Sequence, residues 1–367
     1  MSAEPGVILE GVDRFQVMEP VFECVRVALS YLGESYSPAY IQGISGAAFR
    51  IAGICPCAPT CSTAMWTDAL VDLLGYEMRH YKLTDGVPDF NWDQLVSLAK
   101  LYEANGNVLP ETSDLEGADL RAMREGLGTI IDAVRDEIRA GRPAIVWHAF
   151  TFAEFDVVAG FDETEKVFIG RGSYAGNDDG YAQAPWGRMV TAGYVGGQPA
   201  AITIGAHVRP FKARSAEIAA LQEAVRHARS QNNADKIGDK EWTMLDGLLC
   251  YQRWVDDWRS PEKTRGSGDS YCLGVYRSTH RAAAGFLREI APRYPQAQDQ
   301  MEHAAQAFVS ETDALDAAVP LLGWESPEGP DPERNTRLVP LLQKAMDGYA
   351  QAIDTIESVL VQIGTFG

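Results

Sequence analysis

The stretch that most constrains the fold lies near the N-terminus. It reads Glu19-Pro20-Val21-Phe22-Glu23-Cys24-Val25-Arg26-Val27-Ala28-Leu29-Ser30-Tyr31-Leu32-Gly33. Apolar residues recur at helical spacing, which predicts a helix over 21–32 that ends at Gly33. Cys24 then lies in the first turns of the helix, where the helix dipole can lower the pKa of a thiol. Two interpretations stay open: Cys24 is a nucleophile, or it is a small thiol packed on the apolar face.

Length and composition define the class of protein. The chain has 367 residues, a 46% hydrophobic fraction and a formal net charge of −19, which indicates a globular protein of two domains. The acidic balance disfavours nucleic acid and anionic membrane surfaces as partners. We see no signal peptide and no apolar run long enough to span a membrane, so we expect a cytoplasmic protein with reduced thiols.

Periodicity divides the chain near residue 212. Before it we expect helices at 21–32, 66–74, 92–104 and 127–140, followed by strands at 144–148, 154–159, 166–169, 189–192 and 200–204. After it we expect only helices, near 215–230, 240–258, 271–291, 297–318 and 335–363. The predicted fold class is therefore α+β, with an α+β domain at 1–212 and a helical bundle at 213–367.

Several short motifs together resemble one family. Cys24 with Gly33, the segment 43–49 (Gly-Ile-Ser-Gly-Ala-Ala-Phe), the segment 141–146 (Gly-Arg-Pro-Ala-Ile-Val) and the segment 157–162 (Val-Val-Ala-Gly-Phe-Asp) are similar to the butirosin biosynthesis protein H N-terminal family. The helical half, with Gly274-Val275-Tyr276-Arg277, looks like the domain that often accompanies it. The resemblance implies a papain-like fold related to double-glycine cysteine peptidases, with Cys24 as the nucleophile.

One position departs from that pattern. In the family a strand ends in a G-Y-D motif, which corresponds to Gly160-Phe161-Asp162 here. The family's catalytic histidine lies six residues before that glycine, and this chain has Glu154 at the position. His148, at the end of the preceding predicted strand, is the nearest alternative base, or a histidine hydrogen-bonded at the strand margin. Glu154 is itself a base, a ligand for a cationic group or a solvated residue. Asp156 is a candidate substrate contact, and ordinary peptide hydrolysis is in doubt.

Three cysteines, Cys55, Cys57 and Cys61, lie within seven residues of one another. Their C-x-C-x3-C spacing is unlike that of zinc sites, so we expect no metal site; redox pairing or a proline-stiffened loop fits better. The loop would lie beside Phe49 and Arg50, which are candidate substrate contacts. Arg50 binds a carboxylate there or pairs with an acidic neighbour.

A glycine-rich segment, 170–176, lacks the strand-turn-helix context and the lysine of a phosphate loop. We interpret it as a loop over the site, with Tyr174 as a substrate contact. The whole pattern predicts a cysteine-dependent acyltransferase or amidohydrolase. Its expected substrate is a small molecule or is bound to an acyl carrier, and we expect no cofactor. A homodimer is compatible with this prediction. The alternative is a papain-like binding protein without catalysis. A third possibility is a metal- or thiol-sensing protein.

Overall fold

The computed structural model describes residues 6–54, 67–87, 89–178, 180–195, 198–231, 236–237 and 240–365. Over these residues the chain forms two compact units. Unit 1 comprises 6–16, 20–36 and 67–211, and unit 2 comprises 17–19, 37–54 and the described residues from 212 onward. The change from unit 1 to unit 2 at Phe211/Lys212 lies beside the boundary expected from the sequence, whereas residues 37–54, expected in the first domain, pack with the helices of unit 2.

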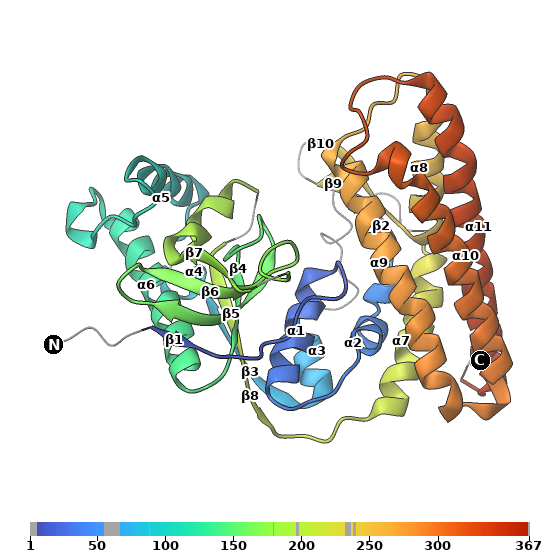
Figure 1. Ribbon diagram of the computed structural model, residues 1–367, viewed down its shortest axis with the longest axis horizontal. Coiled ribbons are helices and arrows are strands. Elements are labelled where there is room, and N and C mark those ends of the chain that lie inside the picture. Colours follow the sequence, from blue (N-terminus) through green and yellow to red (C-terminus); the bar gives the residue numbers. More distant parts are fainter. Residues whose placement is uncertain are drawn as a thin grey trace. The chain divides into compact units, whose positions relative to one another are not determined.

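Unit 1 is built on an antiparallel sheet. Its strands are β1 (Val7–Ile8), β3 (Tyr76–Lys82), β4 (Ala144–Trp147), β5 (Phe155–Asp162), β6 (Val167–Arg171), β7 (Ala182–Pro185) and β8 (Ala200–His207). They follow the order β3-β8-β4-β5-β6-β7, and β1 pairs with β5 (Figure 1). β5 is buried from Asp156 to Phe161, so both faces of the sheet are covered there. Apolar residues, among them valine, isoleucine, alanine and phenylalanine, make up most of the central strands, as a doubly covered sheet requires.

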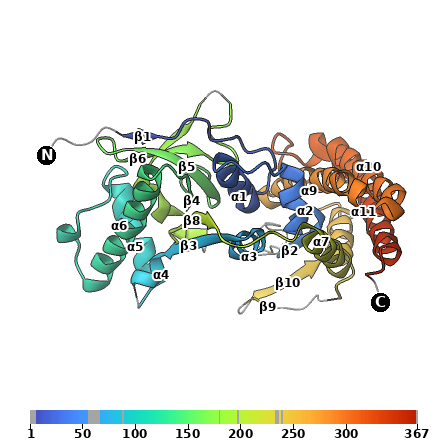
Figure 2. The ribbon, with the colours of Figure 1, turned by 90° about the horizontal axis from the view of Figure 1, so that it is seen from below.

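Helices of unit 1 cover this sheet. They are α1 (Pro20–Tyr31), α3 (Thr67–Leu74), α4 (Leu83–Gly86), α5 (Trp92–Ala104), α6 (Ala118–Arg139) and the 3-10 helices η3 (Thr112–Asp114) and η4 (Trp186–Val195). α6 packs on β3, β4, β5 and β8, and α1 packs on β4 and β5 (Figure 2). α5 packs on η4. The helix that carries Cys24 therefore lies against the hairpin β4–β5.

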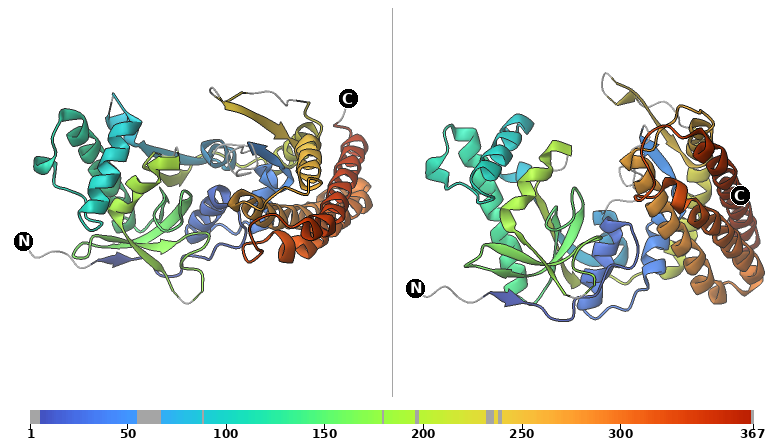
Figure 3. Two further views of the ribbon diagram at one scale, coloured as in Figure 1. Left: turned by 90° about the horizontal axis from the view of Figure 1, so that it is seen from above. Right: turned by 45° about the horizontal axis from the view of Figure 1, so that its top comes forward.

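Unit 2 is mainly helical. Its elements are α2 (Pro38–Ile44), η1 (Ala47–Phe49), α7 (Ala213–Ala228), α8 (Gly247–Trp258), α9 (Ser267–Ile290), η5 (Ala291–Arg293), η6 (Pro295–Ala297), α10 (Gln298–Leu322), α11 (Pro332–Gln362) and the small sheet β2 (Ala52–Ile54), β10 (Lys240–Asp246) and β9 (Lys236–Ile237). The long helices α9, α10 and α11 lie side by side (Figure 3). The fold is thus a mixed α+β fold, with an antiparallel sheet region followed by a helical region.

Two sequence predictions of secondary structure were wrong. The predicted strand 189–192 lies within η4. Met189, Val190 and Ala192 are buried and Thr191 is partly exposed, and so short a run does not distinguish strand from helix. The predicted helix 240–258 begins only at Gly247, and residues 240–246 form β10. The prediction had joined Trp242 to the aromatic residues of α8, which are Tyr251, Trp254 and Trp258.

Several elements were not predicted, among them the strands β1, β2, β3, β7 and β9 and the helices α2 and α4. β3 is a sheet-edge strand that exposes Glu77 and Arg79 on one face and Lys82 at its end. Such charges hide the apolar alternation and protect an edge from further pairing. α2 begins at Pro38 with Ser37 as N-cap, and its seven residues are too few for a periodic signal. None of the helices in the described part of the chain combines the length and the apolar character that a bilayer crossing requires.

Candidate functional site in unit 1

Cys24 is the fifth residue of α1 and is buried. Its sulfur is a thiol and forms no disulfide. The helix begins at Pro20, which lacks an N–H and suits the first helical position. The thiol therefore lies in the second turn of a helix that packs on β4 and β5.

Buried charges fix the segment that precedes α1. The Arg26 guanidinium pairs with Glu23 at 2.7 Å and with Asp13 at 2.6 Å. Arg26 also donates to the Arg14 carbonyl, and the Gln16 N–H donates to Glu23. Burial raises the pKa of Glu23, although Arg26 opposes the shift. The residue next to Cys24 is thus tied to the chain entering the helix.

His148 follows β4 directly and opens the turn to β5. Its φ is +55°, an uncommon backbone conformation for a residue other than glycine. The His148 N–H donates to the Glu154 carbonyl at 2.7 Å, which closes the turn 148–154. Positive φ at a buried histidine marks a position that the surrounding structure enforces.

The His148 ring is held on both nitrogens. Nδ1 lies 3.1 Å from the Thr151 carbonyl oxygen and accepts the Ala153 N–H at 2.8 Å. We assign the proton to Nε2, because the shorter contact makes Nδ1 an acceptor and because the Thr191 hydroxyl beside Nε2 donates elsewhere. Nε2–H then donates to the Thr191 hydroxyl at 2.8 Å, and that hydroxyl donates to the Arg188 carbonyl at 2.9 Å. Burial, and secondly the charge of Arg188, lower the pKa of His148 to about 4. The imidazole is therefore neutral at neutral pH, and its nitrogens are engaged.

Asp156 supports the same turn from β5. Its Oδ2 accepts the N–H of Phe150 at 2.6 Å and that of Thr151 at 2.9 Å. The carboxyl group is fully buried, and burial raises its pKa to about 7. Its Oδ1 lies against Gly172, and within the described residues it forms no hydrogen bond by distance and angle.

A continuous path of contacts links this turn to the start of α1. Gly172 abuts Asp156 and Thr151, and the Asn177 side chain donates to the Gly172 carbonyl at 2.5 Å. The Phe15 N–H donates to the Asn177 side-chain oxygen at 3.2 Å. The main-chain N–H of the next residue, Gln16, donates to the Glu23 carboxylate. The loop 172–177 thus bridges the turn 148–154 and the segment leading to Cys24.

Aromatic rings are exposed on both of these loops. Phe152 is 61% exposed and packs its ring edge-on against His148, with 5.2 Å between ring centroids. Tyr174 is 57% exposed. Partial desolvation of the hydroxyl, and secondly the negative charge of Glu154, raise the pKa of Tyr174 to about 12. Glu154, Tyr174 and Phe152 therefore form a rim that offers apolar and acidic contacts beside His148.

Arg188 is a site residue that sequence reasoning missed. It lies in η4, half-buried, and Nη1 donates to the Ala149 carbonyl at 3.1 Å. The available signal was a single cation beside the apolar run from Met189 to Ala192, which we interpreted as a strand. Reading that run as a strand removed the reason to place Arg188 beside His148.

The remaining predicted contacts, Phe49 and Arg50, belong to unit 2. The Phe49 ring is buried against Phe286 and Phe308. Arg50 lies 3.9 Å from both Glu223 and Asp246. The structure thus brings together Cys24's helix, His148, Glu154, Asp156 and Tyr174 within unit 1, and places Phe49 in the aromatic core of unit 2. Cys55, Cys57 and Cys61 lie outside the described residues, and among those described no cluster of metal-ligating side chains occurs.

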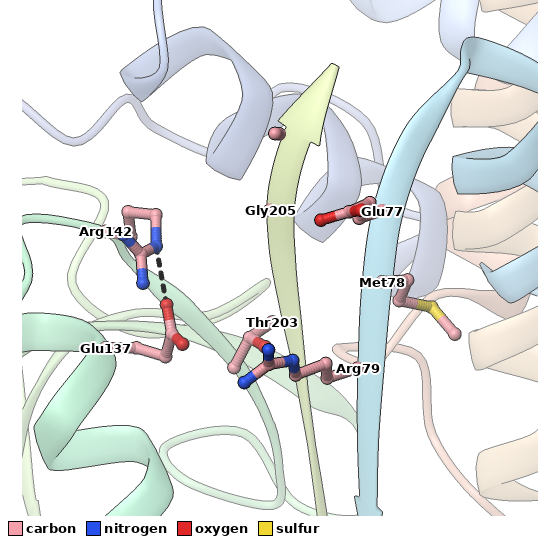
Figure 4. A pocket seen from close by; sticks show the side chains of 8 residues that line it. Glu77, Met78, Arg79, Glu137, Arg142, Thr203 and Gly205 are labelled. Carbon is pink, nitrogen blue, oxygen red and sulfur yellow. Dashed lines mark hydrogen bonds and ion pairs between the residues drawn. The ribbon is translucent and has the colours of Figure 1, made fainter. Parts of the chain in front are cut away.

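A shallow pocket of about 240 Å³ lies elsewhere in unit 1 (Figure 4). It is lined by Glu77, Met78, Arg79, Glu137, Arg142, Thr203, Gly205 and Ala206. Arg142 and Glu137 lie on one side of it and pair at 2.6 Å (Figure 4). No predicted site residue and no cysteine lines it, so it offers no thiol nucleophile.

Comparison with protein-family models and with curated proteins finds no match.

Gly172→Ala tests the close packing of this site. A Cβ there would lie 2.0 Å from Asp156 Oδ1 and 2.3 Å from the Thr151 hydroxyl oxygen. Because neither buried group has room to withdraw, we expect a loss of about 1–3 kcal/mol in unfolding free energy, measured by urea denaturation. Gly180→Ala, where nothing lies within 4 Å, is the control. Equal stability of the two variants would contradict the packing.

Proposed function

We propose that this chain is a papain-like, cysteine-dependent acyltransferase that forms a thioester at Cys24. The observation that carries the proposal is the packing of α1, which bears Cys24, on the two strands that flank the turn 148–154. The resemblance to the butirosin biosynthesis protein H N-terminal family supports it. Exposed aromatic rings beside the turn supply contact area for a small acyl substrate.

The chemistry divides into two transfers. The Cys24 thiol gives its proton to a base, and the thiolate attacks the acyl carbon of a thioester substrate. The leaving thiolate takes a proton, and the acyl group stays on Cys24 as a new thioester. An amine or water then attacks that thioester, loses a proton to the base and returns Cys24 to the thiol.

We assign the role of base to Glu154. His148 already uses both ring nitrogens within the described structure, so it acts as a positioning residue that holds the turn and η4. Glu154 is partly exposed at the end of that turn, in the sequence position where the family keeps its histidine.

The strength of the base selects the substrate. An ordinary thiol and an ordinary glutamate differ by roughly 4 pKa units, which is about 6 kcal/mol against proton transfer. His148, with a pKa of about 4, is no stronger a base. An amide needs protonation of a poor leaving group as well, whereas a thioester releases a thiolate directly. The site therefore suits activated thioesters rather than amides.

Acylation by a small thioester tests this function. Incubation with an N-acetylcysteamine thioester should add one acyl group per chain by intact mass, and peptide mapping should locate it at Cys24. Cys24→Ala should abolish the adduct, because no other group forms the intermediate. Cys272→Ala, which removes another buried thiol, should leave it unchanged. An adduct that persists in Cys24→Ala, or none in the native chain, would refute the proposal.

A binding protein without catalysis is the second candidate. It is favoured by the engagement of both His148 nitrogens and by the burial of Cys24. In that case Cys24 is a packing residue, and the rim of Phe152, Glu154 and Tyr174 binds the ligand. Saturable binding of the thioester without acylation of the native chain would select this candidate.

A further inference from the structure

The Arg188 guanidinium has N–H donors that form no hydrogen bond within the described structure. Of its five N–H donors, one is used within the described structure, in the 3.1 Å bond from Nη1 to the Ala149 carbonyl. No carboxylate of the described residues lies within ion-pairing distance of it. The side chain is half-buried, so this cation is partly removed from water without a directly paired anion.

The backbone around Arg188 is held rigidly beside His148. The Arg188 carbonyl accepts the Thr191 hydroxyl, which in turn accepts His148 Nε2–H. The Arg188 side chain reaches the carbonyl of Ala149, the residue after His148. These two connections join η4 to the turn 148–154, so the guanidinium has a defined position next to the imidazole.

Charges near Arg188 do not neutralise it by contact. The titratable groups that interact with it are His148 and Asp156 from the hairpin β4–β5 and Tyr102 from α5. His148 is neutral, and Asp156 directs Oδ2 to two backbone amides. Burial lowers the pKa of Arg188, against the attraction of Asp156 and Tyr102.

We propose that Arg188 binds an oxyanion of the substrate, a carboxylate or a phosphate, next to His148. A guanidinium presents paired N–H donors whose geometry matches both groups. The inference rests on the proposed function only in taking the surroundings of His148 as the place where substrate binds. A carboxylate would belong to the acyl group itself, and a phosphate to the arm of a carrier.

Histidine NMR of the full-length chain tests the proposal without any acyl transfer. The His148 ring signal, assigned with His148→Asn, is titrated with sodium acetate and separately with inorganic phosphate, against sodium chloride of equal ionic strength. An anion on Arg188 cancels the charge that helps to depress the pKa of His148. We therefore expect a saturable rise of that pKa with acetate, with phosphate or with both.

Variants connect the response to Arg188. Arg188→Gln should weaken anion binding at least tenfold, while Arg79→Gln, an exposed arginine on β3, should bind as the native chain does. Should Arg188→Gln fail to fold, Arg188→Lys decides, because it keeps the charge but loses the paired donors, and we expect roughly fivefold weaker binding.

The two anions distinguish the sources of the oxyanion. Tighter acetate binding assigns a carboxylate, and tighter phosphate binding assigns a phosphate group. A His148 response no larger than that to chloride, or one equal in the Arg188 variants, would overturn the proposal. Anion binding together with failure to acylate Cys24 would refute the proposed function and leave this site standing.

Discussion

Glu311→Ala is expected to lower the free energy of unfolding by about 3–5 kcal/mol, the cost of leaving one partner of a buried ion pair alone. Glu311 lies in α10 and is fully buried. Its Oε1 accepts His280 Nδ1–H at 2.7 Å and the Tyr251 hydroxyl at 2.9 Å. Alanine would strand the imidazolium, remove the acceptor of the Tyr251 hydroxyl and leave a cavity.

The charge on His280 follows from its contacts. Nε2 donates to the Arg50 carbonyl at 2.9 Å, so both ring nitrogens act as donors. Burial alone would lower the pKa of His280, but Glu311 and the Arg50 carbonyl raise it above the usual value. The ring is stacked between Tyr276 and Tyr349, at 5.6 and 5.4 Å between centroids, which favours a cation.

This ion pair matters because it holds the main chain of residues 49–52. The Tyr349 hydroxyl donates to the Phe49 carbonyl at 2.9 Å, His280 to that of Arg50, and the Tyr276 hydroxyl to that of Ala52 at 2.7 Å. Three side chains from α9 and α11 thus bind three main-chain carbonyls where the chain passes from η1 to β2, and these carbonyls would otherwise be left unpaired. Loss of Glu311 should release this segment as well as destabilise the helices.

Urea denaturation at pH 6 measures the effect, with two controls. Glu302→Ala on the same helix removes an exposed pair with Arg288 and should cost no more than about 1 kcal/mol. Glu311→Gln keeps the shape and an acceptor, so it should cost less than Glu311→Ala. Because the folded pKa of His280 is raised, its stabilising contribution is complete below the unfolded pKa and is lost as pH rises through the folded one. A loss under 1 kcal/mol at pH 6 would show that the pair is not formed.

The sequence predicted the helices of unit 2 but not what they enclose. Helical periodicity located α9, α10 and α11, because each buries one continuous apolar stripe. It gave no reason to join His280 to Glu311, since their contact depends on the relative rotation of two helices. Phe49 and Arg50 were expected beside the catalytic site from their proximity in sequence to the three cysteines. That proximity did not predict the aromatic core into which Phe49 packs.

In unit 1 the outcome differs because the local chain does more of the positioning. His148 was expected near the site from the end of a predicted strand, and Glu154 from its position in the family motif. The hairpin β4–β5 brings these two residues and Asp156 to one turn, because a hairpin joins strand ends whatever its surroundings. Arg188 enters through η4, which is distant in sequence and was taken for a strand. Thus contacts within a hairpin were predictable, while those made by tertiary packing were not.

Asp156→Asn is expected to make stability less dependent on pH and to favour the variant in alkaline conditions. In the folded chain burial raises the pKa of Asp156 to about 7, from the usual 3.8. A carboxyl group with a raised folded pKa contributes stability that is complete below its unfolded pKa and is lost as pH rises through the folded value. The loss falls between about pH 4 and 7 and amounts to about 4 kcal/mol, from three pKa units of about 1.4 kcal/mol each.

Asparagine fits the environment of Asp156. Its amide oxygen can accept the N–H groups of Phe150 and Thr151, as Oδ2 does now. Its NH2 group would replace Oδ1 next to the Thr151 hydroxyl. In the described structure neither Asp156 Oδ1 nor the Thr151 hydroxyl oxygen has a hydrogen bond by distance and angle. The exchange therefore removes a buried charge and supplies a donor for that hydroxyl, while the turn 148–154 keeps its support.

Urea denaturation of both proteins at pH 4.5 and pH 8 measures the change. The variant should gain roughly 3–4 kcal/mol relative to the native chain between these two values. Asp162→Asn, at the other end of β5, also replaces a carboxylate that accepts two backbone N–H groups, so it reports the effect of the amide without full burial. An unchanged difference between variant and native chain at the two pH values would mean that Asp156 is ionised throughout. Asp156 would then be a stable anion near Arg188, and the oxyanion proposed there would have to compete with it.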